Sequence, residues 1–371
     1  MSSPDGSPRI ALFIGGLSGG GAERVTVTLA NELAHLGQSV DLVVANGEGP
    51  YRDEISPLVR LIDLGVSRGI YALFPLVLYL YRTRPKAIIS SLPVPNILAS
   101  LARFASPSTK LLLTEHNTVS VDLKGTLKHK ILRVAMAKSY RLADEIVAVS
   151  DGVARDMEAA LGLPPQTVKT IYNPVISATL LQRSYEPVEW EDDDPLIVAA
   201  GRLVPQKDYP TLLHAFAHVR QHRRAKLVIL GEGELRTSLQ RMANELGVAE
   251  DVWLAGFVAN PYPWMRRADL FVLSSSWEGL PTVLLEAMAC GTRVVSTDCP
   301  SGPREILQDG RWGRLTPVGD PNSLARAMLE TLDSQMPPDC GAWLQNFTAA
   351  AAGQFYLELL EIGTSPRLNG Q

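Results

Sequence analysis

The chain has 371 residues, more than one hydrophobic core usually serves, so its length predicts two domains. With 46% hydrophobic and 20% charged residues, its composition is that of a globular protein and excludes a disordered chain. The formal net charge of −4 argues against a nucleic-acid partner. Three cysteines without a Cys-x-x-Cys pair argue against a disulfide framework or zinc site and favour a reducing compartment.

Short apolar runs alternate with amphipathic stretches along nearly the whole chain. Strand candidates of the first half are 9–14, 39–44, 86–89, 110–114 and 145–149. Helix candidates there include 22–35 and 125–142. Continuous apolar strands separated by helices predict a parallel sheet that is covered on both faces. After a break, the same rhythm gives strand candidates at 196–200, 226–230, 251–255, 270–274 and 293–296.

The break between the halves begins at Asn173-Pro174 and ends in a polar, proline-bearing stretch at 186–195. We therefore predict an α/β protein of two Rossmann-like, doubly wound domains that face each other across a cleft. The first should cover 9–173 and the second 195–335. A last helix at 341–362 is expected to pack back on the first domain.

Ligands of doubly wound sheets bind beyond the carboxyl ends of the strands. The first strand runs into a turn with five glycines in seven positions, which lets the backbone approach a ligand closely. The glycines expected to do so are Gly15, Gly16, Gly19 and Gly20. The turn is neither a P-loop nor a dinucleotide fingerprint, so a flexible turn is the alternative. His116 follows the strand at 110–114 and is either directed into the cleft or structural.

The first strand of the second domain ends at Gly201, followed by Arg202 and Lys207 before the next helix. Two cations in this position suit two phosphate groups, although they could also be solvated loop charges. Further along, Gly231-Glu232 and Gly256-Phe257 follow two more strands and offer backbone and a flat ring near a base.

The segment 278–291 reads EGLPTVLLEAMACG, with Pro281 in the first turn of a predicted helix and Gly291 just past its end. Glu278 then lies in the preceding loop and Glu286 in the second turn. Two carboxylates beside a helix N-terminus can grip a polyhydroxy ligand while the exposed N–H groups hold an anion. The alternative is a pair of solvated charges at a helix end.

Glu278 to Glu286 resembles the E-x7-E element of retaining glycosyltransferase family 4, which has the GT-B fold. The resemblance spans about residues 9–362 and is specific through the order of its motifs. These are the glycine-rich start, His116, Asn173-Pro174, Gly201-Arg202 with Lys207, 231–233 and 313–320. The stretches 114–117 and 298–307 are similar to bacterial members that assemble polysaccharides and lipid-linked oligosaccharides.

This resemblance implies that the second domain binds the donor nucleotide. Glu286 would then accept hydrogen bonds from the ribose, and Arg202 and Lys207 would neutralise the diphosphate. Glu278, with the N–H groups of Gly279 and Leu280, would hold hydroxyls of the transferred sugar. His116 and the glycine turn would contact sugar and acceptor from the first domain. Gly231, Glu232, Gly256 and Phe257 would shape the base pocket. His116 and Glu278 are the expected catalytic residues.

The function implied is transfer of a hexose or N-acetylhexosamine from a nucleotide sugar, expected to be a UDP-sugar, to a glycan or lipid-linked acceptor. We expect it to serve cell-surface polysaccharide synthesis such as that of lipopolysaccharide. Because cations and a helix N-terminus can stabilise the leaving diphosphate, we expect no metal and no cofactor. The one D-x-D, at 192–194, lies in the predicted linker. The alternatives are a GT-B nucleotide-sugar epimerase and a non-catalytic sugar-nucleotide-binding subunit.

Residues 123–141 carry six Lys and Arg, no acidic residue, and interleaved apolar side chains. This pattern is typical of a basic amphipathic helix on anionic headgroups, although an ordinary solvated helix face would look similar. The longest apolar run, 70–81, is shorter than the roughly 20 residues that a membrane-spanning helix needs. We therefore expect a cytoplasmic protein attached peripherally to the inner face of the plasma membrane.

Overall fold

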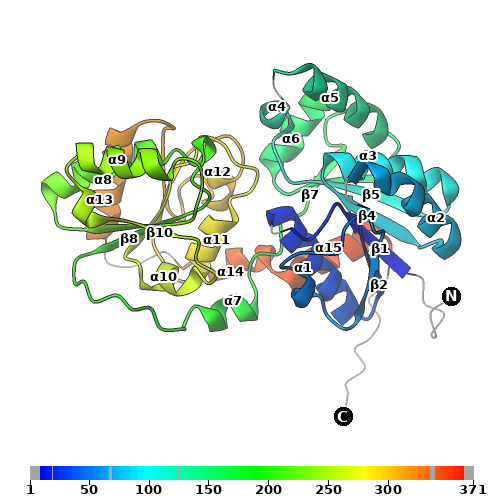
Figure 1. The fold of residues 1–371 in the computed structure, drawn as a ribbon, viewed down its shortest axis with the longest axis horizontal. Coiled ribbons are helices and arrows are strands. Elements are labelled where there is room, and N and C mark those ends of the chain that lie inside the picture. Colours follow the sequence, from blue (N-terminus) through cyan, green and yellow to red (C-terminus); the bar gives the residue numbers. More distant parts are fainter. Residues whose placement is uncertain (1–8, 19, 67–68, 124, 335–338, 363–371) are drawn as a thin grey trace, which may run out of the picture. The chain divides into compact units, whose positions relative to one another are not determined.

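The structure is a computed structural model that describes residues 9–18, 20–66, 69–123, 125–334 and 339–362. The chain divides into two compact units (Figure 1). Unit 1 comprises the described residues of Met1–Pro174 and Phe347–Gln371, and unit 2 is Val175–Asn346. Each unit is built around its own parallel sheet, and each is described by itself.

Unit 1 contains a seven-stranded parallel sheet in the order β3-β2-β1-β4-β5-β6-β7. Its strands are β1 (Arg9–Ile14), β2 (Ser39–Val44), β3 (Val59–Asp63), β4 (Ala87–Ser91), β5 (Lys110–Glu115), β6 (Glu145–Ala148) and β7 (Val168–Thr170). The central strands are almost wholly buried because helices cover both faces of the sheet. Chain order reverses between β1 and β4, the place where doubly wound sheets bind ligands.

The helices of unit 1 connect successive strands. They are α1 (Gly21–His35), α2 (Leu73–Thr83), α3 (Pro93–Ala102), α4 (Val119–Asp122), α5 (Leu127–Tyr140) and α6 (Asp151–Leu161). A core of Ile, Leu and Val joins α1 to one face of β1 and β2. In the described ranges, no helix is both long and apolar enough to cross a bilayer.

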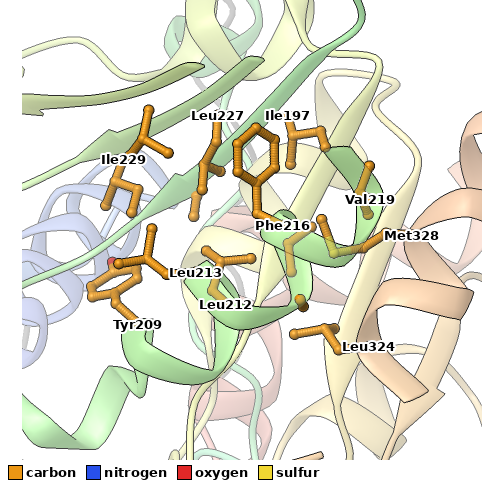
Figure 2. Close-up of a cluster of buried hydrophobic side chains, with 14 of the residues drawn as sticks. Ile197, Tyr209, Leu212, Leu213, Phe216, Val219, Leu227, Ile229, Leu324 and Met328 are labelled. Carbon is orange, nitrogen blue, oxygen red and sulfur yellow. The ribbon is translucent and has the colours of Figure 1, made fainter. Parts of the chain in front are cut away.

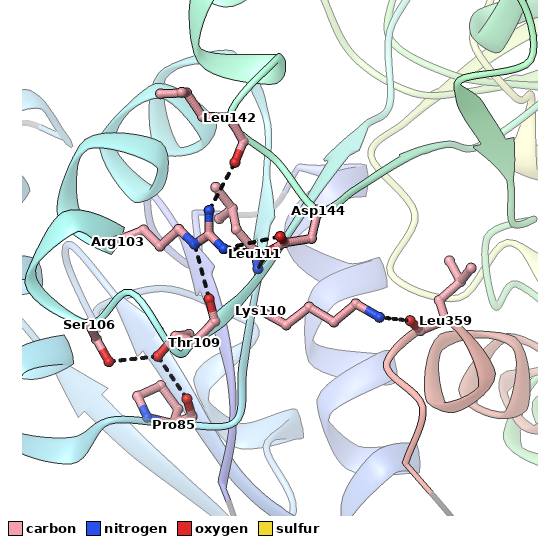
Figure 3. Close-up of polar contacts among 9 residues, drawn as sticks. All are labelled: Pro85, Arg103, Ser106, Thr109, Lys110, Leu111, Leu142, Asp144 and Leu359. Atoms are coloured by element: carbon pink, nitrogen blue, oxygen red, sulfur yellow. Dashed lines mark hydrogen bonds and ion pairs between the residues drawn. The ribbon is translucent and has the colours of Figure 1, made fainter.

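A C-terminal helix, α15 (Ala349–Leu359), packs against α1 and completes the core of unit 1. The Lys110 ammonium donates a 2.6 Å hydrogen bond to the Leu359 carbonyl at its end (Figure 3). In the same view, Arg103 donates to Asp144 and to the carbonyls of Thr109 and Leu142, which fixes the start of β5. Lysine at a helix C-terminus complements the helix dipole.

Unit 2 contains a six-stranded parallel sheet in the order β10-β9-β8-β11-β12-β13. Its strands are β8 (Leu196–Ala200), β9 (Lys226–Leu230), β10 (Val252–Gly256), β11 (Leu270–Leu273), β12 (Val294–Thr297) and β13 (Arg314–Thr316). Its helices are α7 (Ala178–Arg183), α8 (Tyr209–His222), α9 (Arg236–Glu245), α10 (Tyr262–Arg267), α11 (Thr282–Ala289), α12 (Pro303–Ile306), α13 (Pro321–Asp333) and α14 (Gly341–Leu344).

The core of unit 2 centres on Phe216 of α8 (Figure 2). Its ring lies between Ile197 and Leu227 of the sheet and Met328 of α13. Burying a side chain of this size contributes about 1.5–3 kcal/mol. The core therefore holds the strands whose carboxyl ends carry most of the candidate residues.

The structure confirms the expected fold class of two parallel α/β units, with differences at element boundaries. β3, β7 and β13 were absent from the sequence prediction, because two of them have three residues and β3 is half-buried. The expected helix at 341–362 is two separate helices, α14 in unit 2 and α15 in unit 1. The segment after Pro174, expected to be a linker, belongs to unit 2 and contains α7. Asn260 and Arg266 of unit 2 donate hydrogen bonds to the C-terminal end of α7 and hold it there.

A buried carboxylate, Asp41 of β2, ties the amino-terminal half of unit 1 together. It accepts hydrogen bonds from Arg9 at 2.9 Å, from Arg60 at 2.8 and 2.5 Å, and from the Tyr79 hydroxyl at 2.7 Å. The Asp41 side chain is fully buried. Burial of Tyr79 itself, together with the nearby Asp41 charge, raises the pKa of Tyr79. The network joins β1, β2, β3 and α2.

We predict that Asp41→Asn destabilises unit 1 by about 3 kcal/mol, because two arginines lose their buried counter-ion. All six tryptophans lie in unit 2, so their fluorescence does not report on unit 1. The urea midpoint measured by far-ultraviolet circular dichroism should therefore fall more than the midpoint measured by tryptophan fluorescence. The control Glu48→Gln removes an exposed partner of Arg52 and should cost less than about 1 kcal/mol. Equal midpoints for Asp41→Asn and the unaltered protein would contradict this account.

Candidate functional site

Three strands of unit 2 end in glycine turns that pack directly on one another. Gly201, Gly231 and Gly256 follow or end β8, β9 and β10, and all have positive φ. The Gly231 N–H donates to the Gly256 carbonyl at 2.8 Å. A Cβ on Gly231 would lie 2.0 Å from the Gly201 oxygen, so this position admits glycine alone. The backbone therefore forms a floor of glycine turns at the carboxyl edge of the sheet.

Lys207 and Glu278 form an ion pair at this edge, with 2.6 Å between Nζ and Oε1. Their side chains are 15% and 8% exposed. The Ser275 hydroxyl donates to the same Glu278 oxygen at 2.6 Å. Charge-assisted hydrogen bonds of this length are strong, and they fix the carboxylate in one orientation.

Two backbone segments hold this ion pair in place. The Ser274 hydroxyl, after β11, donates to the Lys207 carbonyl at 2.7 Å. The Ser276 N–H donates to the Gln206 carbonyl at 2.8 Å, and the Gln206 amide donates to the Trp277 carbonyl at 2.9 Å. The loops after β8 and β11 therefore form one connected unit, in which Lys207 and Glu278 have little freedom.

Glu286 lies in the second turn of α11, as the helix signals predicted, and its side chain is buried. Pro281 precedes the helix and Gly291 follows it with φ +82°. Gly302 packs against the start of α11, since a Cβ there would lie 2.4 Å from the Pro281 Cδ. Gly279 and Leu280 complete the loop between Glu278 and the helix. The helix N-terminus is thus flanked by a carboxylate on either side in sequence.

The remaining candidates of unit 2 differ in how they are held. Arg202 is exposed, and its guanidinium makes no hydrogen bond or ion pair within the ranges described. Glu232 is paired with Arg236 at 2.8 Å, and Phe257 is 81% exposed. Arg202 is therefore a free cation near Lys207 in sequence, while Glu232 is already engaged by α9.

In unit 1, Gly15, Gly16 and Gly20 lie in the turn between β1 and α1, and Gly19 falls outside the described residues. His116 follows β5 and is half-buried. Burial lowers the pKa of His116 to about 4, so the imidazole is neutral at pH 7. His116 is thus suited to hydrogen bonding, or to accepting a proton only weakly.

A buried network that the sequence analysis missed lies beneath His116. Glu115 is fully buried and accepts hydrogen bonds from the backbone N–H of His116 at 3.0 Å and from the Tyr140 hydroxyl at 2.9 Å. Asn96 donates to the Tyr140 hydroxyl at 2.7 Å. Burial and the Glu115 charge raise the pKa of Tyr140. The sequence offers one signal for this network: Glu115 ends an apolar strand, and a buried carboxylate needs hydrogen-bond donors around it.

The carboxylates of 192–194 have cationic partners. Asp192 pairs with Lys226 at 3.4 Å, and Asp194 with Arg224 at 3.2 Å, which fastens this segment to the start of β9. Among the residues that the structure describes, no cluster of three or more His, Cys, Asp or Glu side chains could hold a metal ion.

Comparison with known proteins identifies the class. A family model described as Glycosyltransferase Family 4 matches residues 19–178, and one described as Glycosyl transferases group 1 matches 194–334. The lipopolysaccharide outer core galactosyltransferase WaaB shares the fold, with a TM-score of 0.72 at 22% identity over 95% of this chain and 99% of that one. Anabaena Alr3699/HepE in complex with UDP-glucose gives a TM-score of 0.70 at 18% identity over 95% of both chains. The fold is therefore GT-B.

Two bacterial glycosyltransferases are similar in sequence to this chain along most of its length. An N-acetylgalactosamine-N,N'-diacetylbacillosaminyl-diphospho-undecaprenol 4-alpha-N-acetylgalactosaminyltransferase of Campylobacter jejuni is 30% identical over 88% of this chain and 90% of its own. The lipopolysaccharide core biosynthesis glycosyltransferase LpsE of Rhizobium meliloti is 30% identical over 83% of this chain and 84% of its own. The chain belongs to glycosyltransferase family 4, which confirms the resemblance found in its sequence.

We predict that the His116 imidazole titrates near pH 4 rather than at the ordinary value of about 6.5, because its charged form is desolvated. Nuclear magnetic resonance of the side chain, assigned by its loss in His116→Gln, measures this directly. Since the folded pKa is depressed, the contribution of this group destabilises the fold as pH falls from about 6.5 towards 4. A midpoint at 6.5 would show that His116 is solvated.

Proposed function

We propose that this glycosyltransferase moves a hexose or N-acetylhexosamine from a UDP-sugar to a lipid-linked glycan acceptor, with retention of anomeric configuration and without a metal. The observation that carries the proposal is the Lys207–Glu278 pair beside the start of α11. The relatives support the acceptor class, since they act on diphospho-undecaprenol-linked glycans or build lipopolysaccharide core. The UDP-glucose complex of HepE, which shares the fold, supports the choice of base.

In this proposal the ammonium group of Lys207 moves away from Glu278 and binds the donor diphosphate. Lys207 and the free guanidinium of Arg202 then neutralise the two phosphates, and the N–H groups at the start of α11 face the same charge. Glu278, still held by Ser275, accepts hydrogen bonds from the hydroxyls of the sugar. Glu286 accepts hydrogen bonds from the hydroxyls of the ribose. In this exchange Lys207 keeps an anionic partner, and the Glu278 carboxylate, which gives up its counter-ion, is held by hydrogen bonds from Ser275 and the sugar hydroxyls.

Transfer breaks the bond between the anomeric carbon and the diphosphate oxygen and forms a bond from that carbon to the acceptor oxygen. The acceptor hydroxyl proton passes to the departing diphosphate, whose charge Arg202 and Lys207 stabilise. Attack from the same face retains the configuration. A neutral His116 hydrogen-bonds the sugar without adding positive charge near the reacting carbon, and the glycine turn after β1 admits the acceptor.

Membrane attachment is part of the same proposal. α5 exposes both apolar and basic side chains, namely Leu127, Ile131 and Val134 with Lys128, Lys130 and Arg133. α5 packs on α3, and α3 packs on α2. α2 and the short segments beside it expose further large apolar side chains, namely Ile70, Tyr71, Phe74 and Phe104. Apolar area next to lysine and arginine fits an anionic lipid surface. A protein working on a lipid-linked acceptor at the cytoplasmic face needs such a surface.

We predict that Arg202→Ala weakens UDP-sugar binding about 10- to 100-fold, since it removes one charged hydrogen-bonding group worth about 1.5–3 kcal/mol. Glu278→Gln should lower kcat about 100-fold while UDP still binds. Calorimetry and product analysis measure these effects, with the exposed Arg241→Ala of α9 as the matched control.

The assay uses UDP-, GDP- and ADP-sugars in the presence of EDTA, with a diphospho-undecaprenol-linked oligosaccharide as acceptor. Transfer with an unchanged anomer from a UDP-sugar supports the proposal. Three results would overturn it: an epimerised sugar formed from donor alone, inversion of the anomer, or activity that EDTA abolishes.

We predict that replacing Lys128, Lys130 and Arg133 by alanine reduces binding to phosphatidylglycerol vesicles roughly 100-fold at low salt. Each basic residue near an anionic surface contributes about 1 kcal/mol. Co-sedimentation measures this, with the exposed Arg241, Arg311 and Arg326 replaced together as the control on unit 2. Binding that survives the α5 replacement, or that both triple variants lose equally, would refute attachment through α5.

A further inference from the structure

Unit 2 carries a surface groove of about 410 Å³ that the proposed reaction does not use. It lies between the segment after α7 and the β10–α10 connection. Its lining includes Trp253 and Trp264, the carboxylates Glu186 and Glu189, and the amide Asn260. β10 is an edge strand of the sheet, so the groove opens at the side of unit 2.

The two tryptophans of the lining, Trp253 and Trp264, pack against a third, Trp190, which is outside the lining. Trp190 stacks on Trp253 with 6.4 Å between ring centroids and 17° between planes. Trp264 meets Trp253 edge-on at 5.3 Å and Trp190 edge-on at 5.8 Å. Contact on two sides fixes the ring of Trp253, yet its side chain is still 47% exposed. A rigid, half-exposed indole is a preorganised contact surface.

The polar groups of the groove are carboxylates and an amide. The Asn260 amide donates to Glu186 at 2.7 Å, which fixes both groups. Glu189 is exposed, and its carboxylate has no partner within the described ranges. The described lining contains no lysine or arginine. Glu186 pairs with Arg183, outside the lining, at 3.6 Å, so Glu189 carries the groove's uncompensated negative charge. Such a charge repels phosphate and carboxylate ligands and suits a ligand rich in hydroxyl donors.

Stability alone does not account for the tryptophans. The indole N–H of Trp190 is buried and finds no acceptor among the described residues. Leaving a buried donor unpaired costs about 1–3 kcal/mol, which phenylalanine in the same place would avoid. Exposing half of Trp253 also leaves apolar area in water.

We propose that this groove binds a neutral oligosaccharide, with a sugar ring stacked on Trp253 and its hydroxyls donating to Glu189 and Asn260. This inference goes beyond the proposed transfer reaction, because it assigns unit 2 a second site for glycan that is distinct in its residues from Arg202, Lys207, Glu278 and Glu286. A glycan held there stays with the enzyme independently of the donor nucleotide.

The test titrates the full-length protein with maltohexaose and chitohexaose and follows the six indole N–H signals by nuclear magnetic resonance. The signals are assigned with single Trp→Phe variants. At least one oligosaccharide should shift the Trp253 and Trp264 signals and leave Trp312 unmoved. Trp253→Ala should weaken this binding about tenfold or more, Trp253→Phe less, and the control Trp312→Ala not at all.

Several outcomes overturn the inference: no shift with either oligosaccharide, equal affinity in Trp253→Ala, or signals that move only at Trp312. A change of oligomeric state in Trp253→Ala, measured by sedimentation, would instead make the groove a contact between copies of this chain. UDP-sugar binding is measured on the same samples. Its absence together with oligosaccharide binding would refute the proposed function and leave this inference standing.

Discussion

The donor-site proposal depends on one buried ion pair, Lys207 with Glu278. Both side chains are largely removed from water, so each charge needs a partner, and the Ser275 hydroxyl donates a further hydrogen bond to Glu278. Loops from two strands have to be fastened together to hold such a pair, and Ser274 and Gln206 do this. In the proposed reaction Lys207 exchanges Glu278 for phosphate, and sugar hydroxyls take the place of the ammonium group as donors to Glu278.

A second constraint is the backbone floor beneath that pair. The Gly201, Gly231 and Gly256 turns approach so closely that side chains cannot be added to Gly231. Parallel strands bring these turns to the carboxyl edge of the sheet, the edge at which doubly wound sheets bind ligands. The core around Phe216 packs against the same strands and buries them. The candidate donor site of unit 2 therefore depends on backbone conformations and close contacts that only glycine allows.

Much of this could be predicted from the sequence, and the parts that could not have physical reasons. The long apolar strands and the Pro281–Gly291 helix signals gave the two units and placed Glu278 and Glu286 correctly in loop and helix. Three-residue strands such as β7 carry too little pattern to detect. Partners distant in sequence also leave no local signal, as with Glu115 and Tyr140, or Trp190 and Trp253. The polar sequence of 174–194 indicates a linker, because the hydrogen bonds and ion pairs that anchor it to unit 2 come from residues distant in sequence.

A crystal structure with an intact UDP-sugar tests the central claim most directly. We expect the diphosphate on Lys207 and Arg202, with Lys207 withdrawn from Glu278, and the sugar and ribose hydroxyls on Glu278 and Glu286. A nucleotide bound away from the carboxyl edge of the β8–β11 strands, or bound while the Lys207–Glu278 pair stays closed, would contradict the account.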